Sequence, residues 1–420
     1  MSMIAGIICE YNPFHNGHLL QMQQLREEKG AEVILCVMGG HFLQRGEPSL
    51  LEKERRVMMA LSCGADLVIE LPALYACRSA YWFALGGVSL LAAAGATHLA
   101  FGAETDALPD LLATASRLVQ PDPTYQDALR QALNAGLSYA EAQTKALNSG
   151  THREFVPVLP NDRLALSYLR IIIEKGFPMR PILIPRQGSG FLDPDLSGDS
   201  SLPASATAIR QRLAECVQSG GGRQLSLSQL MDAGLNAYIP EQALPFLADT
   251  PLVFPADAYP IQLALFRRAA LDSLAELPDM TEGLEYRVFH AAGRSSSMEE
   301  FYTLLRTRRY TLTRLQRMAA HLLIDYRQSH AVLLREGLPY LRILGMNPRG
   351  QQHLHSIRKD ITIPIVTRTS QMKAATKTSS IAAVSWELEL RATAIHSLLS
   401  GRDFSKGNPE YYFSTRVIQN

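Results

Sequence analysis

The sequence predicts an α/β protein: a Rossmann-like domain with a parallel sheet, followed by a mainly helical C-terminal domain. Two observations carry this prediction. Between residue 4 and about residue 219, short apolar runs of strand character alternate with segments of helical length, which is the pattern of βαβ units. After the glycine run 220–222, apolar positions recur mostly at helical spacing. We therefore expect a catalytic domain at residues 1–219 and a second domain at residues 223–420.

The expected elements follow one another along the chain. Strands are expected at residues 4–9, 32–38, 65–72, 97–102 and 179–184, and helices at 19–28, 51–63, 79–94, 160–175 and from 205 onward. Two helices are expected within 106–148, as an insertion, and Asn161 is the expected N-cap of the helix that follows. A strand-like insert is expected at 341–344 and 361–366, and a polar tail from residue 401 onward.

Composition excludes several classes of protein. The 420 residues are 47% hydrophobic and 19% charged, which is enough apolar material for a large core. We expect no membrane segment, because no apolar run is long enough, and no signal peptide, because a basic n-region is missing. The five cysteines form no CxxC pair, so neither a zinc site nor a disulfide framework is indicated. A cytoplasmic location is the simplest expectation.

Charge is distributed unevenly along the chain. Residues 301–420 hold 18 Lys and Arg against 7 Asp and Glu, so the remainder of the 41 basic and 40 acidic residues leaves 23 basic and 33 acidic before residue 301. The last part therefore carries about +11 and the rest about −10. Such polarity is typical of an enzyme body with a basic arm for nucleic acid. A solvated helical surface is the alternative, and charge alone does not decide between them.

The most informative motif is His15-Asn16-Gly17-His18, which follows a strand and a proline turn and precedes a helix. A helix N-terminus offers unpaired N–H groups and partial positive charge to a phosphate. Gly17 has no side chain, so an adenine ring can lie against the backbone. His15 and His18 can both donate hydrogen bonds to one α-phosphate as charge develops there. The alternative is that the two histidines only cap and pack a turn.

Further candidates lie in the loops that follow the expected strands, where open α/β sheets bind their ligands. Gln44 and Arg45 lie in a glycine-flanked loop, in which an arginine fork can hold a phosphate or carboxylate, unless the loop is an ordinary surface turn. Arg186 leaves the end of a strand. Lys53 would either meet departing pyrophosphate or belong to a helix surface. The helix start at 205–210 would either grip phosphate with Arg210 or serve as an ordinary cap.

These motifs together resemble the bacterial tRNA(Met) cytidine acetate ligase family. The matching runs are residues 10–18 (EYNPFHNGH), 40–48 (GHFLQRGEP), 66–72 (DLVIELP), 101–104 (FGAE), 205–210 (SATAIR) and 365–368 (IVTR). The resemblance implies a HIGH-type nucleotidyltransferase domain and an ATP-dependent ligase. Acetate would attack the α-phosphate of ATP, and the acetyl group would pass to N4 of the wobble cytidine of elongator tRNA(Met). Mg²⁺ would enter with the ATP phosphates, with no metal held by the protein.

The resemblance also implies which residues bind. From the chemistry of the residues themselves, His15 and His18 would be catalytic, and Gln44 and Arg45 are our candidates for holding acetate or the incoming cytidine. The chain departs from the family pattern at 161–165 (NDRLA) and at 191–193 (FLD). The residues expected to line ATP are Ile7, Ile8, Cys9, Glu10, Tyr11, Asn12, Pro13, Phe14, His15, Asn16, Gly17, His18, Leu19, Leu20, Gly102, Asn161, Asp162 and Arg186.

Two other functions remain open at the level of the sequence. A related nucleotidyltransferase would adenylylate a phosphorylated small metabolite without RNA. A non-catalytic RNA-binding protein on a degenerate version of the same fold would not bind ATP, and the intact HxGH motif argues against it. Pyrophosphate exchange and ATP binding distinguish these alternatives from a ligase.

Overall fold

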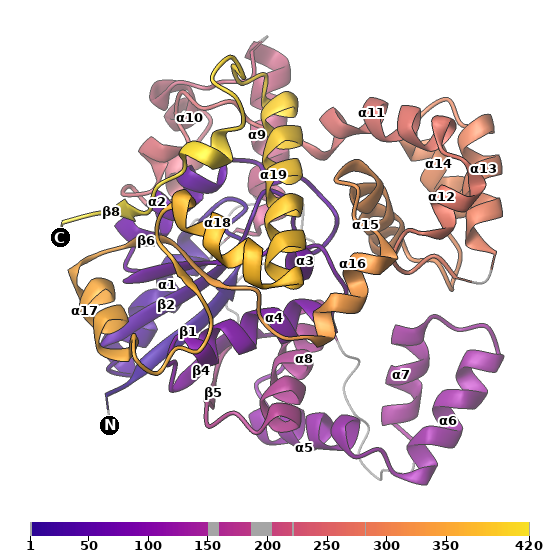
Figure 1. Ribbon diagram of the computed structural model, residues 1–420, viewed down its shortest axis with the longest axis horizontal. Coiled ribbons are helices and arrows are strands. Elements are labelled where there is room, and N and C mark those ends of the chain that lie inside the picture. The colour runs from indigo at the N-terminus through magenta and orange to yellow at the C-terminus, as the bar shows by residue number, and fades with distance from the viewer. Residues whose placement is uncertain (1, 150–158, 186–203, 221, 282, 420) are drawn as a thin grey trace.

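The computed structural model describes residues 2–149, 159–185, 204–220, 222–281 and 283–419 (Figure 1). The described strands form one sheet in the order β5-β4-β1-β2-β3-β6-β7, with β8 paired to β6. The five strands β1 to β5 run parallel to one another, and β6 runs antiparallel to β3. The strands are β1 (Ile4–Cys9), β2 (Val33–Gly39), β3 (Leu67–Leu71), β4 (His98–Ala103), β5 (Arg180–Pro185), β6 (Leu341–Met346), β7 (Ile365–Val366) and β8 (Arg416–Val417).

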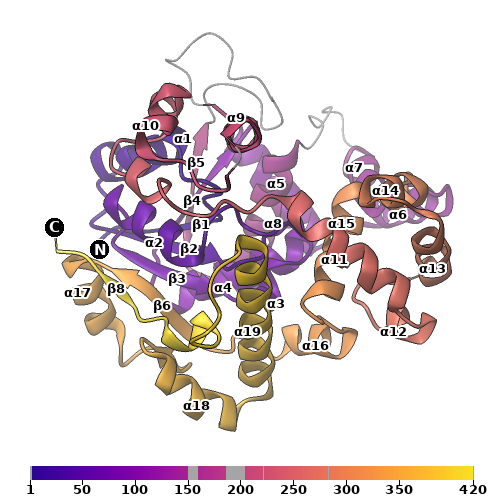
Figure 2. The same cartoon turned by 90° about the horizontal axis from the view of Figure 1, so that it is seen from above.

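The helices fall into groups around and beside the sheet (Figures 1 and 2). Around the sheet lie α1 (Asn16–Gln23), continued by the π-helix η1 (Gln24–Glu28), α2 (Lys53–Ser62), α3 (Ala73–Ala76), α4 (Ala80–Ala93), α8 (Pro160–Lys175), α9 (Ala206–Gly220), α10 (Leu227–Asp232), α17 (Pro348–Ile357), α18 (Thr369–Thr378) and α19 (Ser380–Ser400). Beside them lie α5 (Leu108–Val119), α6 (Pro123–Asn134) and α7 (Tyr139–Leu147), and then α11 (Pro255–Arg268), α12 (Leu271–Ala275), α13 (Leu284–Arg294), α14 (Met298–Leu305), α15 (Leu312–Leu323) and α16 (Gln328–Val332). Short 3-10 helices are η2 (Leu235–Ala237), η3 (Leu244–Phe246), η4 (Leu333–Arg335) and η5 (Pro409–Tyr412).

The central strands are buried on both faces, which explains their nearly continuous apolar sequences. Because successive side chains of a strand point to opposite faces, Leu35 and Val37 of β2 join one core, whereas Cys36 and Met38 join the other. The first core is closed by α4, α8 and α17, and the second by α1, α2 and α9. The βαβ pattern of the sequence therefore predicted the sheet correctly.

Three local predictions were wrong. The first helix begins at Asn16, not residue 19, because the His15 side chain caps it. The insertion contains three helices, α5, α6 and α7, where two were expected, since a turn at residues 135–138 separates α6 from α7. The N-cap of α8 is Leu159, and Asn161 lies inside the first turn.

The C-terminal residues are also more ordered than the predicted polar tail. Glu410 of η5 is 1% exposed, and β8 pairs with β6. Strand β6, as expected from its apolar run, brings residues 341–346 into the sheet beside β3. The sheet thus extends across the boundary at residues 220–222, and the division into two domains remains a prediction.

The helices α11, α13, α14 and α15 share a separate small core that includes Phe266, Val288, Phe301 and Leu315. In Figures 1 and 2, α15 lies on the side of this helical unit that faces the sheet, and α13 lies on the far side. Among the described helices, none combines the length and the apolar character needed to cross a membrane.

Candidate active site

The turn between β1 and α1 brings two imidazole rings together. The His15 and His18 rings are stacked, with centroids 3.8 Å apart and an interplanar angle of 27°. Nδ1 of His15 accepts a hydrogen bond from the Gly17 N–H at 3.1 Å, and Nδ1 of His18 accepts one from the His15 N–H at 3.3 Å. A neutral imidazole that accepts at Nδ1 carries its proton at Nε2. Both rings therefore have an Nε2–H donor in this arrangement.

The first backbone N–H groups of α1 are already bonded within the protein. The Asn16 N–H donates to the Tyr238 carbonyl at 2.9 Å, the Gly17 N–H to His15 Nδ1, and the His18 N–H to the His15 carbonyl at 2.9 Å. The expectation that these groups are open to an anion was therefore wrong for this conformation. At this turn, a phosphate would therefore be met by the imidazole rings of His15 and His18 rather than by the backbone of α1.

The aromatic rings of Tyr11 and Phe14 pack against the His18 ring. Tyr11 is buried, with a positive φ of 47°, and its ring lies 4.8 Å from Phe14 and 4.9 Å from His18. The Tyr11 hydroxyl lies 3.4 Å from the Cys36 sulfur. The predicted ATP-lining residues Tyr11 and Phe14 thus act in this structure as the packing that orients the second histidine.

Hydrogen bonds from distant segments fix the same turn. Asn12 Oδ1 accepts from the Leu50 N–H at 2.7 Å, and the Asn12 carbonyl accepts from Arg210 at 2.8 Å. The Asn16 side chain donates to the Ala237 carbonyl at 2.8 Å. Arg210 therefore holds the turn, and Ser205 accepts from the Ala208 N–H as an ordinary cap.

The other predicted ATP-lining residues are spread over both faces of β1 and the first turns of α1. Ile7 and Cys9 belong to the core under α1 and α2, whereas Ile8 packs against the core under α4. Burial raises the pKa of the Cys9 thiol well above its usual value, so this cysteine is a neutral packing group. Pro13 is buried, and Leu19 and Leu20 are half-buried in α1.

The loops after β1, β2 and β3 are joined through Gln44. Its backbone N–H donates to the Glu10 carboxylate at 2.6 Å, and its side chain donates to the Arg78 carbonyl at 3.3 Å. Burial raises the pKa of Glu10, and the neighbouring arginines Arg45 and Arg56 act against this shift. Glu10 and Gln44 thus lie together at the carboxyl ends of the parallel strands, as the sequence predicted.

Arg56 of α2 is a positioning residue that sequence reasoning missed. Its side chain is fully buried and donates to the carbonyls of Glu10 at 2.8 Å, Gly39 at 2.9 Å and Gly40. The signal in the sequence was an arginine at a core-facing position of an amphipathic helix. By binding three carbonyls, Arg56 fixes the ends of β1 and β2 relative to each other.

The loop of Gln44 and Arg45 packs directly on α15. Gly46 has a φ of +80°, and a Cβ there would lie 2.4 Å from the Arg317 backbone nitrogen. Gln316 donates to Glu47 at 3.4 Å across the same contact. The helical unit therefore sets the position of both candidate substrate residues.

This contact gives a first prediction. Gly46→Ala introduces both an unfavourable φ and a clash of its Cβ with the backbone of α15. Gly30→Ala introduces the same kind of unfavourable φ, +74°, but its Cβ has no atom within 4 Å. We expect Gly46→Ala to lose at least about 1 kcal/mol more unfolding free energy than Gly30→Ala. Urea denaturation of both variants measures the difference, and equal losses would contradict the close packing described.

Asn161 and Asp162 contact the loop after β4, close in sequence to Gly102. Gly102 lies in β4 opposite Ile184 of β5. The Asp162 carboxylate accepts from the Glu104 N–H at 2.9 Å and from the Thr105 N–H at 3.1 Å and hydroxyl at 2.7 Å.

The Glu104 carboxylate in turn accepts hydrogen bonds from the Asn161 N–H at 3.1 Å, from the Asn161 side chain at 2.7 Å and from the Asp162 N–H at 3.0 Å. The two carboxylates thus hold each other's backbone segments, and Asp162 is 2% exposed. In this structure Asp162 positions the loop after β4. Arg186 lies outside the described residues.

Lys53 occupies neither of its two expected positions. It is 1% exposed and forms ion pairs with Glu70 of β3 and with Glu410 at 2.9 Å, and its Nζ lies 3.5 Å from the carboxyl group of Glu389 of α19. Arg342 of β6 pairs with Glu70 at 3.0 Å and also with Glu410. The network therefore joins α2, two strands, α19 and the C-terminal segment.

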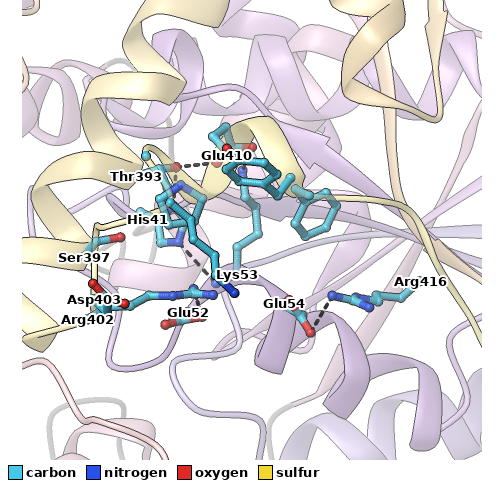
Figure 3. Close-up of a pocket in the computed structure, with 15 residues that line it drawn as sticks. His41, Glu52, Lys53, Glu54, Thr393, Ser397, Arg402, Asp403, Glu410 and Arg416 are labelled. Carbon is cyan, nitrogen blue, oxygen red and sulfur yellow. Dashed lines mark hydrogen bonds and ion pairs between the residues drawn. The ribbon is translucent and has the colours of Figure 1, made fainter.

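Figure 3 shows that Lys53 and Glu410 lie at the inner end of a cavity of about 290 Å³. His41 and Thr393 line it as well, and at its mouth Arg402 pairs with Glu52 and Arg416 with Glu54. Its polar side chains are largely bonded to one another and come from far outside the predicted ATP-lining run. We interpret this region as a structural ion network.

The network predicts a pH dependence of stability. Burial, together with the charge of Glu70, raises the pKa of Glu389 to about 8, whereas Lys53 lowers it. Folded Glu389 then keeps its proton up to about pH 8, but unfolded Glu389 loses it above its ordinary pKa of 4.5. The unfolding free energy therefore falls as pH rises between these values.

Glu389→Gln removes the ionisation while keeping an acceptor for the Ala73 N–H. We expect the Tm of this variant, relative to the unaltered chain, to rise between ~pH 5 and ~pH 8.5. Thermal unfolding across that range measures it, and a constant Tm difference would show that Glu389 does not titrate as described.

Comparison with known proteins places this arrangement in a family. The family model described as HIGH Nucleotidyl Transferase matches residues 1–409. A curated tRNA(Met) cytidine acetate ligase from Syntrophomonas wolfei is 37% identical over 419 residues, covering 96% of this chain and 98% of the relative. The chain belongs to the tRNA(Met) cytidine acetate ligase family. A protein of the same name from Bacillus subtilis is 35% identical over 406 residues, covering 94% and 92% of the two chains.

Solved structures agree with this family. The structure described as Thermotoga maritima TmcAL, apo, matches with a TM-score of 0.89 at 26% identity, covering 100% of both chains. A second, described as bound with alpha-thio ATP, matches with a TM-score of 0.87 at 26% identity and the same coverage. The sequence-based identification of the tRNA(Met) cytidine acetate ligase family is confirmed, as is the fold class.

Proposed function

We propose that this chain is an ATP-dependent ligase that transfers acetate to N4 of the wobble cytidine of elongator tRNA(Met). The single observation that carries the proposal is the pair of stacked imidazoles, His15 and His18, with both Nε2–H donors at the end of β1. Membership of the tRNA(Met) cytidine acetate ligase family over nearly the whole chain supports the choice of substrates.

In the first step, a carboxylate oxygen of acetate attacks the α-phosphorus of ATP. A bond forms between that oxygen and phosphorus, and the bond from the α-phosphorus to the bridging oxygen breaks. Pyrophosphate leaves with the electron pair, and acetyl-adenylate remains. The reaction needs alignment and charge stabilisation more than proton transfer. His15 and His18 would supply the charge stabilisation by donating hydrogen bonds to the non-bridging oxygens of the α-phosphate.

ATP would lie along the run from residue 7 to residue 20, with its adenine against the backbone at Gly17. Gly102 of β4 and Asn161 of α8 are proposed as further contacts to ATP. Asp162 is proposed to orient this region through its hydrogen bonds with Glu104. Arg186 is also proposed to contact ATP. Mg²⁺ would arrive on the phosphates of ATP, and no protein ligand is assigned to it.

In the second step, N4 of the cytidine attacks the acetyl carbon of the adenylate. The new bond is an amide, AMP leaves with the electrons of the acyl–oxygen bond, and the amine releases one proton. Gln44 and Arg45 are proposed to hold acetate or the incoming cytidine, since their loop is fixed by Glu10 on one side and α15 on the other.

The basic region from residue 301 to the C-terminus is proposed to bind the tRNA through its phosphates, so that affinity falls as salt rises. The domain of residues 1–219 would contain the catalytic site, and the domain of residues 223–420 would make most of the contacts with RNA. We place the reaction in the cytoplasm, where tRNA and ATP are both present.

One assay tests the proposal. The protein is incubated with ATP, labelled acetate and elongator tRNA(Met), and the RNA is digested to nucleosides. We expect labelled N4-acetylcytidine that depends on both ATP and acetate. Pyrophosphate exchange driven by a phosphorylated metabolite without RNA would instead favour a metabolite nucleotidyltransferase, and a failure to bind ATP would favour a non-catalytic RNA-binding protein.

A further inference from the structure

Three arginines lie near Asp279 beside the loop of Gln44. Arg78, from the loop after β3, approaches Asp279 with both terminal nitrogens, at 3.3 and 3.5 Å. Arg314 of α15 donates to the Asp279 carbonyl at 2.5 Å and to the Thr281 hydroxyl at 3.0 Å. Arg317, one turn further along α15, lies close enough to be influenced by Arg78, Arg314 and Asp279. We call these three arginines the α15 arginine cluster.

The α15 arginine cluster has more donors than the described residues satisfy. The Nε atoms of Arg78, Arg314 and Arg317 are buried and have no hydrogen-bond partner among the described residues. Arg78 is 4% exposed, so water does not replace that partner easily. Among those residues, the Arg317 side chain has neither a hydrogen bond nor an ion pair.

Charge is likewise unbalanced at this position. Of the three guanidinium groups, that of Arg78 contacts the Asp279 carboxylate, and the charge of Asp279 also acts on Arg317. Three positive charges near one carboxylate leave a net charge of about +2 in this partly buried region. Burial lowers the pKa of Arg317, and the neighbouring charges of Arg78 and Arg314 lower it further, whereas Asp279 opposes the change. An additional anion would stabilise these arginines, because it reduces their mutual repulsion and accepts their hydrogen bonds.

The cluster adjoins the candidate substrate residues. The Arg317 backbone lies directly against Gly46, next to Arg45, and the Arg78 carbonyl accepts from the Gln44 side chain. The buried Tyr310 ring lies 5.0 Å from the Arg314 guanidinium and 5.4 Å from that of Arg287. Beyond Tyr310 in the same loop, Arg306 and Arg308 are exposed.

We propose that the α15 arginine cluster binds a phosphodiester of the RNA substrate next to the nucleotide that is acetylated. This inference rests on the proposed function. Its ligand chemistry, a phosphoryl oxygen, is shared by RNA and by the phosphates of ATP. The observations favour RNA, because positive charge continues from the cluster along the α14–α15 loop to Arg306 and Arg308. A polymer of phosphates can use all of these positions, whereas a triphosphate held at His15 and His18 cannot.

Arg317→Met tests the assignment, since it keeps an unbranched side chain and breaks no hydrogen bond or ion pair of the described residues. Binding of elongator tRNA(Met) is followed by fluorescence anisotropy at several salt concentrations. We expect the Kd of Arg317→Met to rise about tenfold at low salt, with the slope of log K against log salt reduced by about 1. Arg317→Lys keeps the charge, so it should recover most of the slope.

Arg268→Met is the matched control, because Arg268 is exposed on α11 of the same helical unit and does not belong to the α15 arginine cluster. The proposal is wrong if Arg317→Met and Arg268→Met give the same Kd and the same salt slope. It is equally wrong if Arg317→Met changes the KM for ATP or inhibition by pyrophosphate but not RNA binding, since the site would then serve the nucleotide phosphates. Absence of N4-acetylcytidine with the unaltered protein is a separate result, which contradicts the proposed function.

Discussion

His18→Asn should reduce acetate-dependent exchange between ATP and pyrophosphate by about 100- to 1000-fold, the usual cost of losing one preorganised donor to a transition-state oxyanion. The choice of asparagine follows from the geometry of the turn. His18 Nδ1 accepts from the His15 N–H at 3.3 Å, and an asparagine side chain can keep that acceptor. It has no group that replaces Nε2–H. The variant therefore separates the chemical role of the ring from its role in the turn.

The exchange assay needs two controls. The Tm of His18→Asn should stay close to that of the unaltered protein, which shows that the turn is retained. His355→Asn, on the exposed side of α17, should exchange at the normal rate. If His18→Asn exchanges within about twofold of the unaltered protein, Nε2 of His18 does not contact the reacting phosphate and the assignment must be abandoned.

Lys53→Met should cost about 3–5 kcal/mol of unfolding free energy, the range found when one partner of a buried ion pair is removed. Methionine keeps the length of the side chain but leaves Glu70 and Glu410 with Arg342 as their ion-pair partner, and it removes the ammonium group beside Glu389. Because these carboxylates come from β3, η5 and α19, the loss should also loosen the C-terminal segment. Urea denaturation measures the change in free energy.

Arg130→Met provides the comparison for an exposed ion pair. Arg130 and Asp127 of α6 lie 3.6 Å apart with 72% and 65% of their side chains exposed, so this variant should lose no more than about 0.5 kcal/mol. Similar small losses in Lys53→Met and Arg130→Met would mean that the buried network is not a determinant of stability.

The parts of the fold that the sequence predicted are those governed by local pattern. Strands β1 to β5 could be recognised because each is apolar on both faces and is followed by a helix. The HxGH turn was found because its residue types and position, after a strand and a proline, suit phosphate chemistry. The start of α1 was missed since its cap is an imidazole, which is not among the usual capping residues.

The rest depends on partners that are distant in sequence. Lys53 was expected at a surface or at pyrophosphate, but its partner Glu410 lies 357 positions further along the chain. The role of Asp162 follows from its contact with Glu104, 58 positions earlier. Such contacts leave no periodic signal, and only the packed structure shows which polar groups are satisfied inside the protein.

A crystal structure with a non-reactive ATP analogue is the most direct test of the central claim, that two imidazoles at the end of β1 hold the α-phosphate. The account predicts an α-phosphate oxygen within about 3 Å of Nε2 of both His15 and His18. A nucleotide bound elsewhere, with both rings directed into the protein interior, would contradict it.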